Sequence, residues 1–436
     1  MTGRIPQSWG RYPRAKDSRV IPLNWSTDRL PNSANDKLLP FGMGRSYGDS
    51  CLNEGGTLLA TKGLDRFLQF DPQSGVLRCE AGVSLDEVLQ FAVPRGWFLP
   101  TSPGTKFITI GGAIANDIHG KNHHRAGTFG CHVSRFELIR SDGSRLECSA
   151  TQNPELFSST IGGLGLTGLI TWVEFQLRPI TSSMIDMESI KFQSLDEFVE
   201  LSGESDRAFE YTVAWLDCLA RGPKQGRGIF MRGNHLESKT GKIEICHRLR
   251  LAVPFEMPAF VLNGHLMKMF NSFYYSKQGA VKRSTTVHYE PFFYPLDSIA
   301  NWNLMYGRDG FFQYQLVVPQ SRREAVAEIL DRVVQSRQGT FLAVLKTFGP
   351  IKSPGLLSFP QAGITLALDF ANRGQKTARL FDALDSIVLG AGGRLYPAKD
   401  ARMPAHVFQQ GFPQWKIFSQ YLDPAFSSSF WRRVTT

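Results

Sequence analysis

The sequence predicts an α+β protein with two lobes, and two observations support this. The chain has 436 residues, which is too long for one typical hydrophobic core and suits two domains. Before about residue 180, short apolar runs alternate with turn residues and glycine-rich stretches, which is typical of a strand-rich unit. Beyond that point strands alternate with helices to about residue 390, which indicates a second lobe built on an antiparallel sheet.

The first lobe is expected to consist mainly of short strands. Four apolar runs between turn residues, KLLPFG, GTLLAT, RFLQFD and GVLRCE, fill residues 37–80. Residues 84–96 begin with a serine cap and continue with helical apolar spacing, so a helix is predicted there. A strand pair turns at Asp142-Gly143, because Asp-Gly favours a tight hairpin turn. Residues 153–180 are expected to form a short helix, a glycine-rich turn and a strand.

In the second lobe the apolar periodicity separates helices from strands. Helices are predicted at 194–203, 323–339 and 376–393, the last two amphipathic and ended by glycine. Strands are predicted at 311–319, 340–349 and 364–370. The last 40 residues are rich in proline, aromatic residues and arginine, and they fit a closing segment better than a new domain.

Composition and charge restrict the partners. The 49 basic and 39 acidic residues give a net charge of +10, which favours nucleic acid, a phosphorylated substrate or an anionic membrane, or reflects only a basic surface. The basic residues are scattered and no nucleic-acid module is recognisable, so nucleic acid is disfavoured. The six cysteines include no CxxC pair, which argues against a disulfide framework or a thiolate zinc site and favours the cytoplasm.

No segment is expected to span a membrane. The first 16 residues lack the apolar core of a signal peptide, and no run of about 18 uncharged apolar residues occurs. The apolar stretch at 251–275 comes nearest, but it carries two charges and is broken by two prolines and a glycine. It is expected to be either a core helix or an apolar flap lying on a membrane.

Three glycine-rich stretches stand out before residue 170, at 40–50, 103–124 and 161–170. Glycine permits positive φ and removes the Cβ where a ligand must touch the backbone. Successive bare N–H groups can then bind phosphate oxygens. One such loop could be only a tight turn, but three in one half of the chain favour an extended cofactor with a pyrophosphate.

Two other interpretations of these stretches are weaker. A Rossmann fingerprint needs G-x-G-x-x-G opening a helix, but Tyr47 occupies the third glycine position and no helix follows. His119 and His123 have the spacing of zinc ligands on a helix, but Gly120 and Asn122 disfavour a helix there, and no metal is predicted. The remaining alternative is that these histidines are loop residues bonded to the backbone.

The motifs together resemble a known family. GMGRSYGDS, PGT…TIGGAIANDIHGKNHHRAGTFG and GGLGLTG look like the FAD-binding domain of the vanillyl-alcohol-oxidase, or PCMH, type. Within that family the likeness is to the decaprenylphosphoryl-β-D-ribose 2-oxidases. It runs from SWGR at 8–11 to GGRLYPAKDARM at 392–403 and so covers nearly the whole chain.

The resemblance implies FAD as cofactor and a set of residues that hold it. The implied FAD-binding residues are Gly42, Met43, Gly44, Arg45, Ser46, Tyr47, Gly48, Asp49, Gly104, Thr109, Ile110, Gly111, Gly112, Asn116, Asp117, Ile118, His119, Ile170 and Tyr396. Many relatives bind the flavin covalently through a histidine in the first glycine loop. Because Tyr47 stands at that position, non-covalent FAD is expected.

The resemblance also implies the residues on the substrate side. They are Lys121, Trp215, Tyr294, Gln313, Gln315, Lys346 and Phe348, with Lys399 and His119 as the catalytic pair. Either Lys399 or His119 would take the hydroxyl proton, since a general base needs a pKa near the working pH. The alternative for Lys399 is an ion pair with Asp400 or another carboxylate.

The implied architecture is a two-subdomain FAD-binding domain at 1–182, a substrate-binding domain at 183–391 and a C-terminal segment at 392–436 returning to the FAD domain. The implied activity is oxidation of the 2-hydroxyl of a polyprenylphosphoryl-ribose, as the first half of an epimerisation to arabinose for cell-wall arabinan. A short-chain dehydrogenase would be the partner reductase, and the protein would lie in the cytoplasm, peripheral to the inner face of the membrane. An alditol or aldonolactone oxidase acting on a soluble polyol, or a non-catalytic flavin-binding protein, are the alternatives.

The chain departs from the family pattern at one place. Where the resembled enzymes have N-x-C-V-D-F, this sequence has TLALDF, with Thr365 and Ala367 at the asparagine and cysteine positions. The substitution changes the predicted pocket wall and removes a thiol. It removes no group that the implied chemistry requires.

Overall fold

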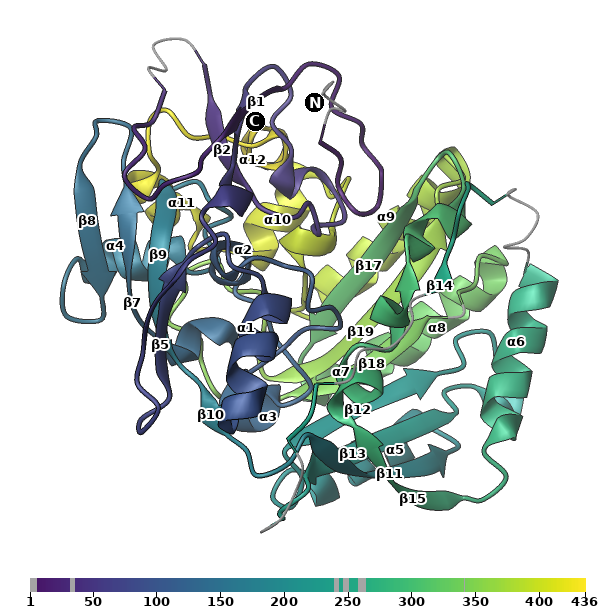
Figure 1. Cartoon of the computed structure of the whole chain (residues 1–436). Coiled ribbons are helices and arrows are strands. Elements are labelled where there is room, and N and C mark those ends of the chain that lie inside the picture. The colour runs from purple at the N-terminus through teal and green to yellow at the C-terminus, as the bar shows by residue number, and fades with distance from the viewer. Residues whose placement is uncertain (1–5, 32–35, 239–242, 246–250, 258–263, 341) are drawn as a thin grey trace.

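The first lobe is built from two small sheets. The computed structural model describes residues 6–31, 36–238, 243–245, 251–257, 264–340 and 342–436. A parallel sheet in the order β1-β3-β2 comprises β1 (Arg19–Pro22), β3 (Thr57–Ala60) and β2 (Leu38–Phe41). A five-stranded antiparallel sheet in the order β4-β5-β9-β7-β8 comprises β4 (Phe67–Phe70), β5 (Val76–Glu80), β9 (Leu169–Gln176), β7 (Val133–Ile139) and β8 (Arg145–Ser149). The two sheets lie in the upper left part of Figure 1.

Local signals in the first lobe act as the sequence predicts. Helix α1 (Leu85–Ala92) begins at Ser84, whose side chain accepts from the backbone N–H of Glu87 while the Glu87 side chain accepts from Ser84, a capping box. Strands β7 and β8 are joined by a turn in which Gly143 has φ +85°. The shorter elements are β6 (Trp97–Phe98), paired with β10 (Arg178–Pro179), and the helices α2 (Ile110–Ala115), α3 (His123–Ala126) and α4 (Pro154–Thr160).

The second lobe is organised on one antiparallel sheet of eight strands. Their order is β15 (Lys282–His288), β11 (Met184–Phe192), β13 (Gly228–His235), β12 (Tyr211–Leu216), β18 (Ala343–Phe348), β19 (Gly363–Ala371), β17 (Phe311–Val318) and β20 (Arg394–Leu395). The prediction of an α+β fold with an antiparallel sheet in the second lobe is confirmed.

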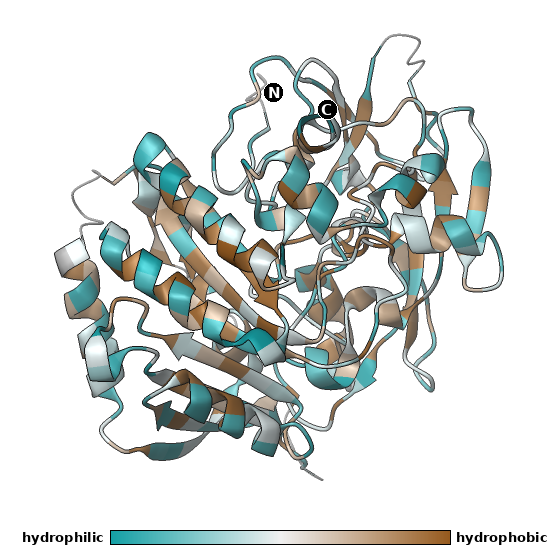
Figure 2. Ribbon diagram, turned by 180° about the vertical axis from the view of Figure 1, so that it is seen from behind, coloured by the Kyte–Doolittle hydropathy of each residue, from teal (hydrophilic) through white to brown (hydrophobic). Residues whose placement is uncertain are grey.

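Three amphipathic helices cover one face of this sheet: α5 (Leu195–Ser205), α8 (Glu324–Ser336) and α9 (Gln375–Gly390). Their apolar sides join the strands in one hydrophobic core, and their polar sides face outward, as the view from behind in Figure 2 shows. The prediction that glycine ends both long helices is wrong for α8, which ends at Arg337 with φ +55°. The other face of the sheet turns toward the first lobe (Figure 1).

The last segment contacts both lobes. Strand β20 adds to the eight-stranded sheet beside β17. Helices α10 (Ala405–Gly411), α11 (Trp415–Phe418) and α12 (Ser429–Thr435) follow. Phe426 forms a parallel bridge with Leu38 of β2, and Arg433 of α12 forms an ion pair with Asp49. The last segment therefore lies against the first lobe, while the domain boundaries at 182 and 391 stay a prediction.

The apolar stretch at 251–275 is not one helix, although Met267 and Tyr275 within it are buried in hydrophobic clusters. It begins with β14 (Leu251–Ala252), which pairs with β16 (Ile299–Ala300), and ends in α6 (Gly264–Lys277); residues 258–263 lie outside the described residues. Helix α7 (Tyr289–Phe293) follows β15. Among the described residues, every helix is too short or too polar to cross a membrane.

Candidate active site

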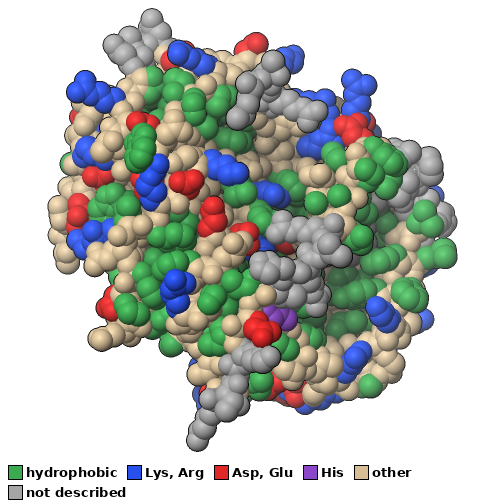
Figure 3. Space-filling model, in the orientation of Figure 1, with side chains coloured by type: hydrophobic (Ala, Val, Ile, Leu, Met, Phe, Trp, Pro, Cys, Tyr) green, Lys and Arg blue, Asp and Glu red, His purple; other side chains and the backbone are tan. Residues whose placement is uncertain are grey.

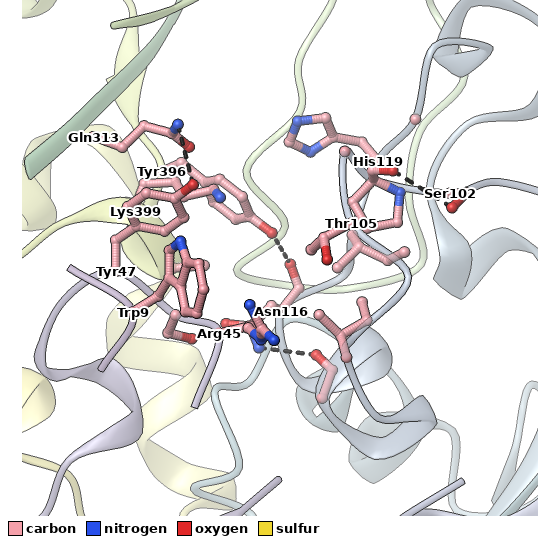
Figure 4. A pocket seen from close by; sticks show the side chains of 18 of the residues that line it. Trp9, Arg45, Tyr47, Ser102, Thr105, Asn116, His119, Gln313, Tyr396 and Lys399 are labelled. Carbon is pink, nitrogen blue, oxygen red and sulfur yellow. Dashed lines mark hydrogen bonds between the residues drawn. The ribbon is translucent and has the colours of Figure 1, made fainter. Parts of the chain in front are cut away.

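A cavity of about 570 Å³ lies between the two lobes. Residues of all three glycine-rich stretches line it on one side, and strands of the eight-stranded sheet line it on the other. The C-terminal segment completes the wall with Tyr396, Ala398 and Lys399. Figure 4 shows Lys399 and Tyr396 facing His119 and Asn116 across this space. Both ends of the chain thus contribute to one site.

The first glycine stretch follows β2 and packs too closely for side chains. Gly44 has φ +61°, which residues with a Cβ adopt only at a cost. A Cβ on Gly42 would lie 2.5 Å from Thr109 Oγ1, and one on Gly48 would lie 1.8 Å from the carbonyl oxygen of Asp400. These glycines therefore let the first stretch contact both the second stretch and the C-terminal segment.

The second glycine stretch leaves bare backbone along the cavity. The Thr109 side chain caps α2 by accepting from the Gly112 N–H at 3.1 Å, and Gly111 and Gly112 line the cavity in the first turn. Gly104 also lines the cavity, and no atom lies within 4 Å of where its Cβ would be. A trough lined by glycines fits a long cofactor with a pyrophosphate, because no side chain keeps the cofactor from the backbone.

Aromatic side chains enclose the cofactor end of the cavity. The Arg45 guanidinium lies 4.0 Å from the centroid of the Trp9 ring (Figure 4). Tyr396 donates a hydrogen bond to the carbonyl oxygen of Asn116 at 2.8 Å and stacks on Phe359. This hydrogen bond joins the C-terminal segment to the loop after α2. Trp9 lines the cavity as well, although the sequence analysis did not single it out.

Three lysines gather on the substrate side. Lys121 Nζ donates to the carbonyl oxygen of Phe293 and Lys346 Nζ to that of Gly120, both at 3.4 Å. Lys399 Nζ lies 3.8 Å from the centroid of the Tyr47 ring. Across the described part of the chain, none of the three forms a salt bridge of the kind that holds Lys106 to Glu290. Lys121 and Lys346, which have no carboxylate partner among the described residues, form a site for an anion.

Burial places the pKa values of these lysines near neutral pH. It lowers the pKa of Lys346 to about 7, assisted by the charges of Lys121 and Lys399. It lowers the pKa of Lys399 to about 7, opposed by the Asp369 carboxylate, and that of Lys121 to about 8. Each of these groups can release a proton at physiological pH, or hold one when an anion is bound.

His119 lies at the junction of the cofactor and substrate sides. Gln315 Nε2 lies 3.0 Å from His119 Nε2, and the His119 Nδ1 atom is buried without a hydrogen-bond partner among the residues that the structure describes. Burial, and then the charge of Lys346, lower its pKa well below the usual value. The imidazole is therefore neutral at pH 7 and accepts the amide hydrogen of Gln315. The unpartnered Nδ1 is a polar atom available to a ligand.

The structure does not show His123 as a zinc ligand or Lys399 in an ion pair with Asp400. The His123 ring packs against Phe348 with centroids 4.5 Å apart, and burial lowers its pKa to about 3. No group of three or more His, Cys, Asp or Glu side chains suited to a metal ion occurs in the described ranges. Asp400 pairs with Arg433 at 2.9 Å instead of with Lys399.

Most of the residues predicted from the sequence line the cavity, but six lie directly behind its wall. These six are Gly48, Asp49, Ile110, Asp117, Tyr294 and Phe348. Asp49 is held by Arg433 at 2.7 Å, and Asp117 accepts hydrogen bonds from two serine side chains. The Tyr294 hydroxyl bonds to Ser102 Oγ at 2.6 Å. The side chains of Asp49, Asp117 and Tyr294 therefore have protein partners and support the wall, and none of the six residues lines the cavity surface.

Most of one part of the cavity, which we call the apolar arm, was not predicted from the sequence. It is lined by Met187, Val213, Trp215, Met231, Val287 and Val344, of which only Trp215 was singled out. These residues occupy alternate positions on β11, β12, β13, β15 and β18. The alternation in YTVAW was the available signal, but it did not distinguish a cavity wall from a core.

Comparison with known proteins agrees with this site. Residues 27–149 match the family described as FAD binding domain. The chain is 35% identical to the decaprenylphosphoryl-β-D-ribose oxidase of Mycolicibacterium smegmatis over 407 residues, covering 90% of this chain and 88% of the relative. It is 29% identical to an uncharacterized protein of Streptomyces coelicolor, with 81% of this chain and all of the relative covered. A D-lactate dehydrogenase of Anaerostipes hadrus is 27% identical over 33% of this chain and 31% of its own.

The fold, the glycine-lined trough and the matching domain define an FAD-dependent oxidoreductase with a PCMH-type FAD-binding domain. FAD fits the trough, where Gly104, Gly111 and Gly112 line the cavity without side chains. With the extent of the match over both lobes, the chain belongs to the family of the decaprenylphosphoryl-β-D-ribose oxidases. The predictions of FAD as cofactor and of this family are confirmed.

Proposed function

We propose that this protein oxidises the 2-hydroxyl of a polyprenylphosphoryl-ribose to the 2-keto sugar. The observation that carries the proposal is the cluster of Lys121, Lys346 and Lys399 beside the predicted flavin position in one cavity. A phosphodiester gives a reason for Lys121 and Lys346, which have no carboxylate partner among the described residues, and a sugar hydroxyl gives a reason for an amine at Lys399 with a pKa of about 7. The name of the M. smegmatis relative points to the same substrate class.

FAD, when bound, supplies the acceptor for the two electrons and the hydrogen that leave C2 as a hydride. Lys399 takes the proton of the 2-hydroxyl, which must leave as the C2–H bond breaks and the C=O bond forms. His119, neutral and held by Gln315, orients the sugar hydroxyl toward Lys399. Lys121 and Lys346 hold the phosphodiester, so the free amine at Lys399 is kept apart from the charge that binds the substrate.

The 2-keto product is the reason to expect a partner. A reductase of the short-chain dehydrogenase class would return a hydride to the opposite face of C2, which converts ribose to arabinose. This reaction and the oxidation together make an epimerisation that supplies the arabinose of cell-wall arabinan. The partner rests on the chemistry of the proposed product.

A polyprenyl substrate lies in a membrane, and α6 has the surface to meet it there. Its residues Leu266, Met269, Phe270 and Phe273 form a stripe that we call the α6 apolar face; Met269 and Phe273 are 68% and 66% exposed. In Figure 3 hydrophobic side chains gather over this helix at the right of the molecule, with lysine or arginine side chains close by. Such a face with neighbouring cations favours peripheral contact with an anionic membrane. We place this contact on the cytoplasmic side, where the proposed polyprenylphosphoryl-ribose would be met.

The experiment is anaerobic reduction of the FAD-loaded protein, followed by the loss of flavin absorbance. Prenylphosphoryl-ribose is expected to bleach the flavin, whereas free alditols and aldonolactones are expected to leave it oxidised. Bleaching by the free polyols alone would replace the proposal by an alditol oxidase. A flavin that no alcohol reduces would make the protein a non-catalytic flavin-binding protein.

Membrane contact is tested with vesicles of anionic phospholipid. Met269→Asp and Phe273→Asp are expected to reduce cosedimentation with the vesicles at least tenfold, because charge enters the α6 apolar face, and to leave FAD bound. Ile417→Asp makes a matched control, since Ile417 is 51% exposed on α11, away from α6. Equal cosedimentation of all four proteins would contradict membrane contact through α6.

A further inference from the structure

A row of side chains crosses the open face of the eight-stranded sheet from the active centre. Paired positions place Gln315 of β17 beside Ala367 of β19, Ala367 beside Val344 of β18, and Val344 beside Trp215 of β12. Paired residues point to the same face, so these four side chains form a continuous strip that borders the cavity. Three strand spacings of about 4.8 Å make the strip roughly 14 Å long.

Polarity changes along this strip. At one end Gln315 holds His119, and Lys346 lies two residues from Val344 on the same face of β18. Beyond Gln315 the strip presents Ala367, Val344 and Trp215, all apolar at the cavity surface. The polar end, at Gln315 and His119, is therefore next to the predicted flavin position, and the apolar end leads away from it.

The apolar end reaches α6. The Tyr274 ring of α6 lies 4.7 Å from the ring of Trp215, and Tyr274 lines the cavity. Val213 pairs with Met231 on the neighbouring strand and continues the apolar lining. Residue Phe273, next to Tyr274, belongs to the α6 apolar face, so the arm ends under the helix that carries the exposed apolar stripe.

We propose that the apolar arm binds the first isoprene units of the substrate's polyprenyl tail, with the phosphodiester at Lys121 and Lys346 and the rest of the tail leaving beside α6. This inference rests on the proposed function and extends it to the lipid. A methionine-rich, partly aromatic wall suits a flexible branched hydrocarbon, because methionine side chains adapt to irregular shapes. An anion site followed by an apolar arm matches the order of phosphate and tail in a prenyl phosphate.

The test measures binding of methyl, geranyl and farnesyl phosphate to the FAD-loaded protein by titration calorimetry. Each step in tail length is expected to lower the Kd at least tenfold in the native protein, because more apolar area leaves water. Val344→Asp is expected to weaken farnesyl phosphate at least tenfold, toward the methyl phosphate value. Val281→Asp is the matched control, since Val281 is 69% exposed outside the cavity, and it is expected to bind like the native protein.

Val344→Thr accompanies these variants, because it changes only polarity at nearly constant volume and keeps the test valid if Val344→Asp loses FAD. It is expected to weaken farnesyl phosphate at least threefold. Equal Kd values for methyl and farnesyl phosphate, or native affinity in both Val344 variants, would overturn the proposal. Tail-dependent binding together with a flavin that prenylphosphoryl-ribose does not reduce would support the arm and reject the proposed oxidation.

Discussion

The role of Lys399 leads to a specific pH dependence of flavin reduction. Burial lowers the pKa of Lys399 from 10.5 to about 7. At pH 7 the free-amine fraction of a lysine with the ordinary pKa is about 0.03%, and with a pKa of about 7 it is roughly one half, an increase of about 1,500-fold. Only the free amine can accept the hydroxyl proton, so the rate should rise about tenfold from pH 6 to pH 8 and then level off.

Neighbouring groups determine how this profile should change. The Asp369 carboxylate raises the pKa of Lys399, and Asp369 itself accepts from Gln313 Nε2 at 2.7 Å. Replacing it by the neutral Asp369→Asn therefore should move the midpoint of the profile to lower pH. Burial holds His119 neutral throughout this range, so His119 cannot give a midpoint near 7. Tyr47 stays protonated, because burial raises its pKa well above 10.

The assay is stopped-flow anaerobic reduction of FAD-loaded enzyme at saturating prenylphosphoryl-ribose from pH 6 to pH 10. Lys399→Arg keeps the positive charge but cannot release a proton, and Lys399→Met removes both. Each is expected to slow reduction by about 10²- to 10⁴-fold and to abolish the midpoint near pH 7. Native-like reduction by Lys399→Arg, or a native rate that still rises from pH 8 to pH 10, would refute the assignment. Loss of FAD from both variants would show that Lys399 acts in cofactor binding.

Three further predictions concern the cofactor and the wall behind it. FAD should dissociate on acid precipitation and leave a colourless pellet, because Tyr47 occupies the position of the linking histidine; a yellow pellet would contradict this. Gly48→Ala should lower both FAD content and Tm, since its Cβ would lie 1.8 Å from a backbone carbonyl oxygen. The control is Gly390→Ala in α9, where no atom lies within 4 Å of the added Cβ, and this variant should be neutral or stabilising. Asp117→Ala should lower the free energy of unfolding by at least about 2 kcal/mol in denaturant titrations, because it leaves buried donors unpaired. A variant whose unfolding midpoint lies at the same denaturant concentration as that of the native protein would contradict this prediction.

Much of the fold could be predicted because its signals are local. Ser84 and Ser194 cap their helices through hydrogen bonds to residues three positions on, a relation that the sequence shows directly. The helix end at Arg337 could not be predicted in this way. An arginine in the left-handed conformation is energetically unfavourable by itself. Gly339 follows two residues later, and a Cβ at that position would lie 2.4 Å from the Leu219 side chain.

The candidate site shows the same division. The glycine stretches indicated a cofactor with phosphates, because absent side chains are visible in the sequence. Tyr396 and Lys399 were placed only through resemblance, and the structure supplies their physical positions through the hydrogen bond to Asn116 and the contact with Tyr47. The six residues behind the wall were grouped with the lining ones, because a motif does not distinguish a side chain that faces a ligand from one that supports it.

The sequence by itself determined the class of fold, the glycine trough, the cofactor and the family. Each depends on residues close together in the chain or on a motif that few other sequences carry. Only the tertiary structure decided which face of β12, β13 and β18 borders the cavity, and with it the apolar arm and the anion site without carboxylate partners. The physical reason is that strand register and lobe packing bring together residues that are far apart in the sequence, such as Lys121, Trp215 and Lys346. No pattern among neighbouring residues in the sequence encodes this proximity.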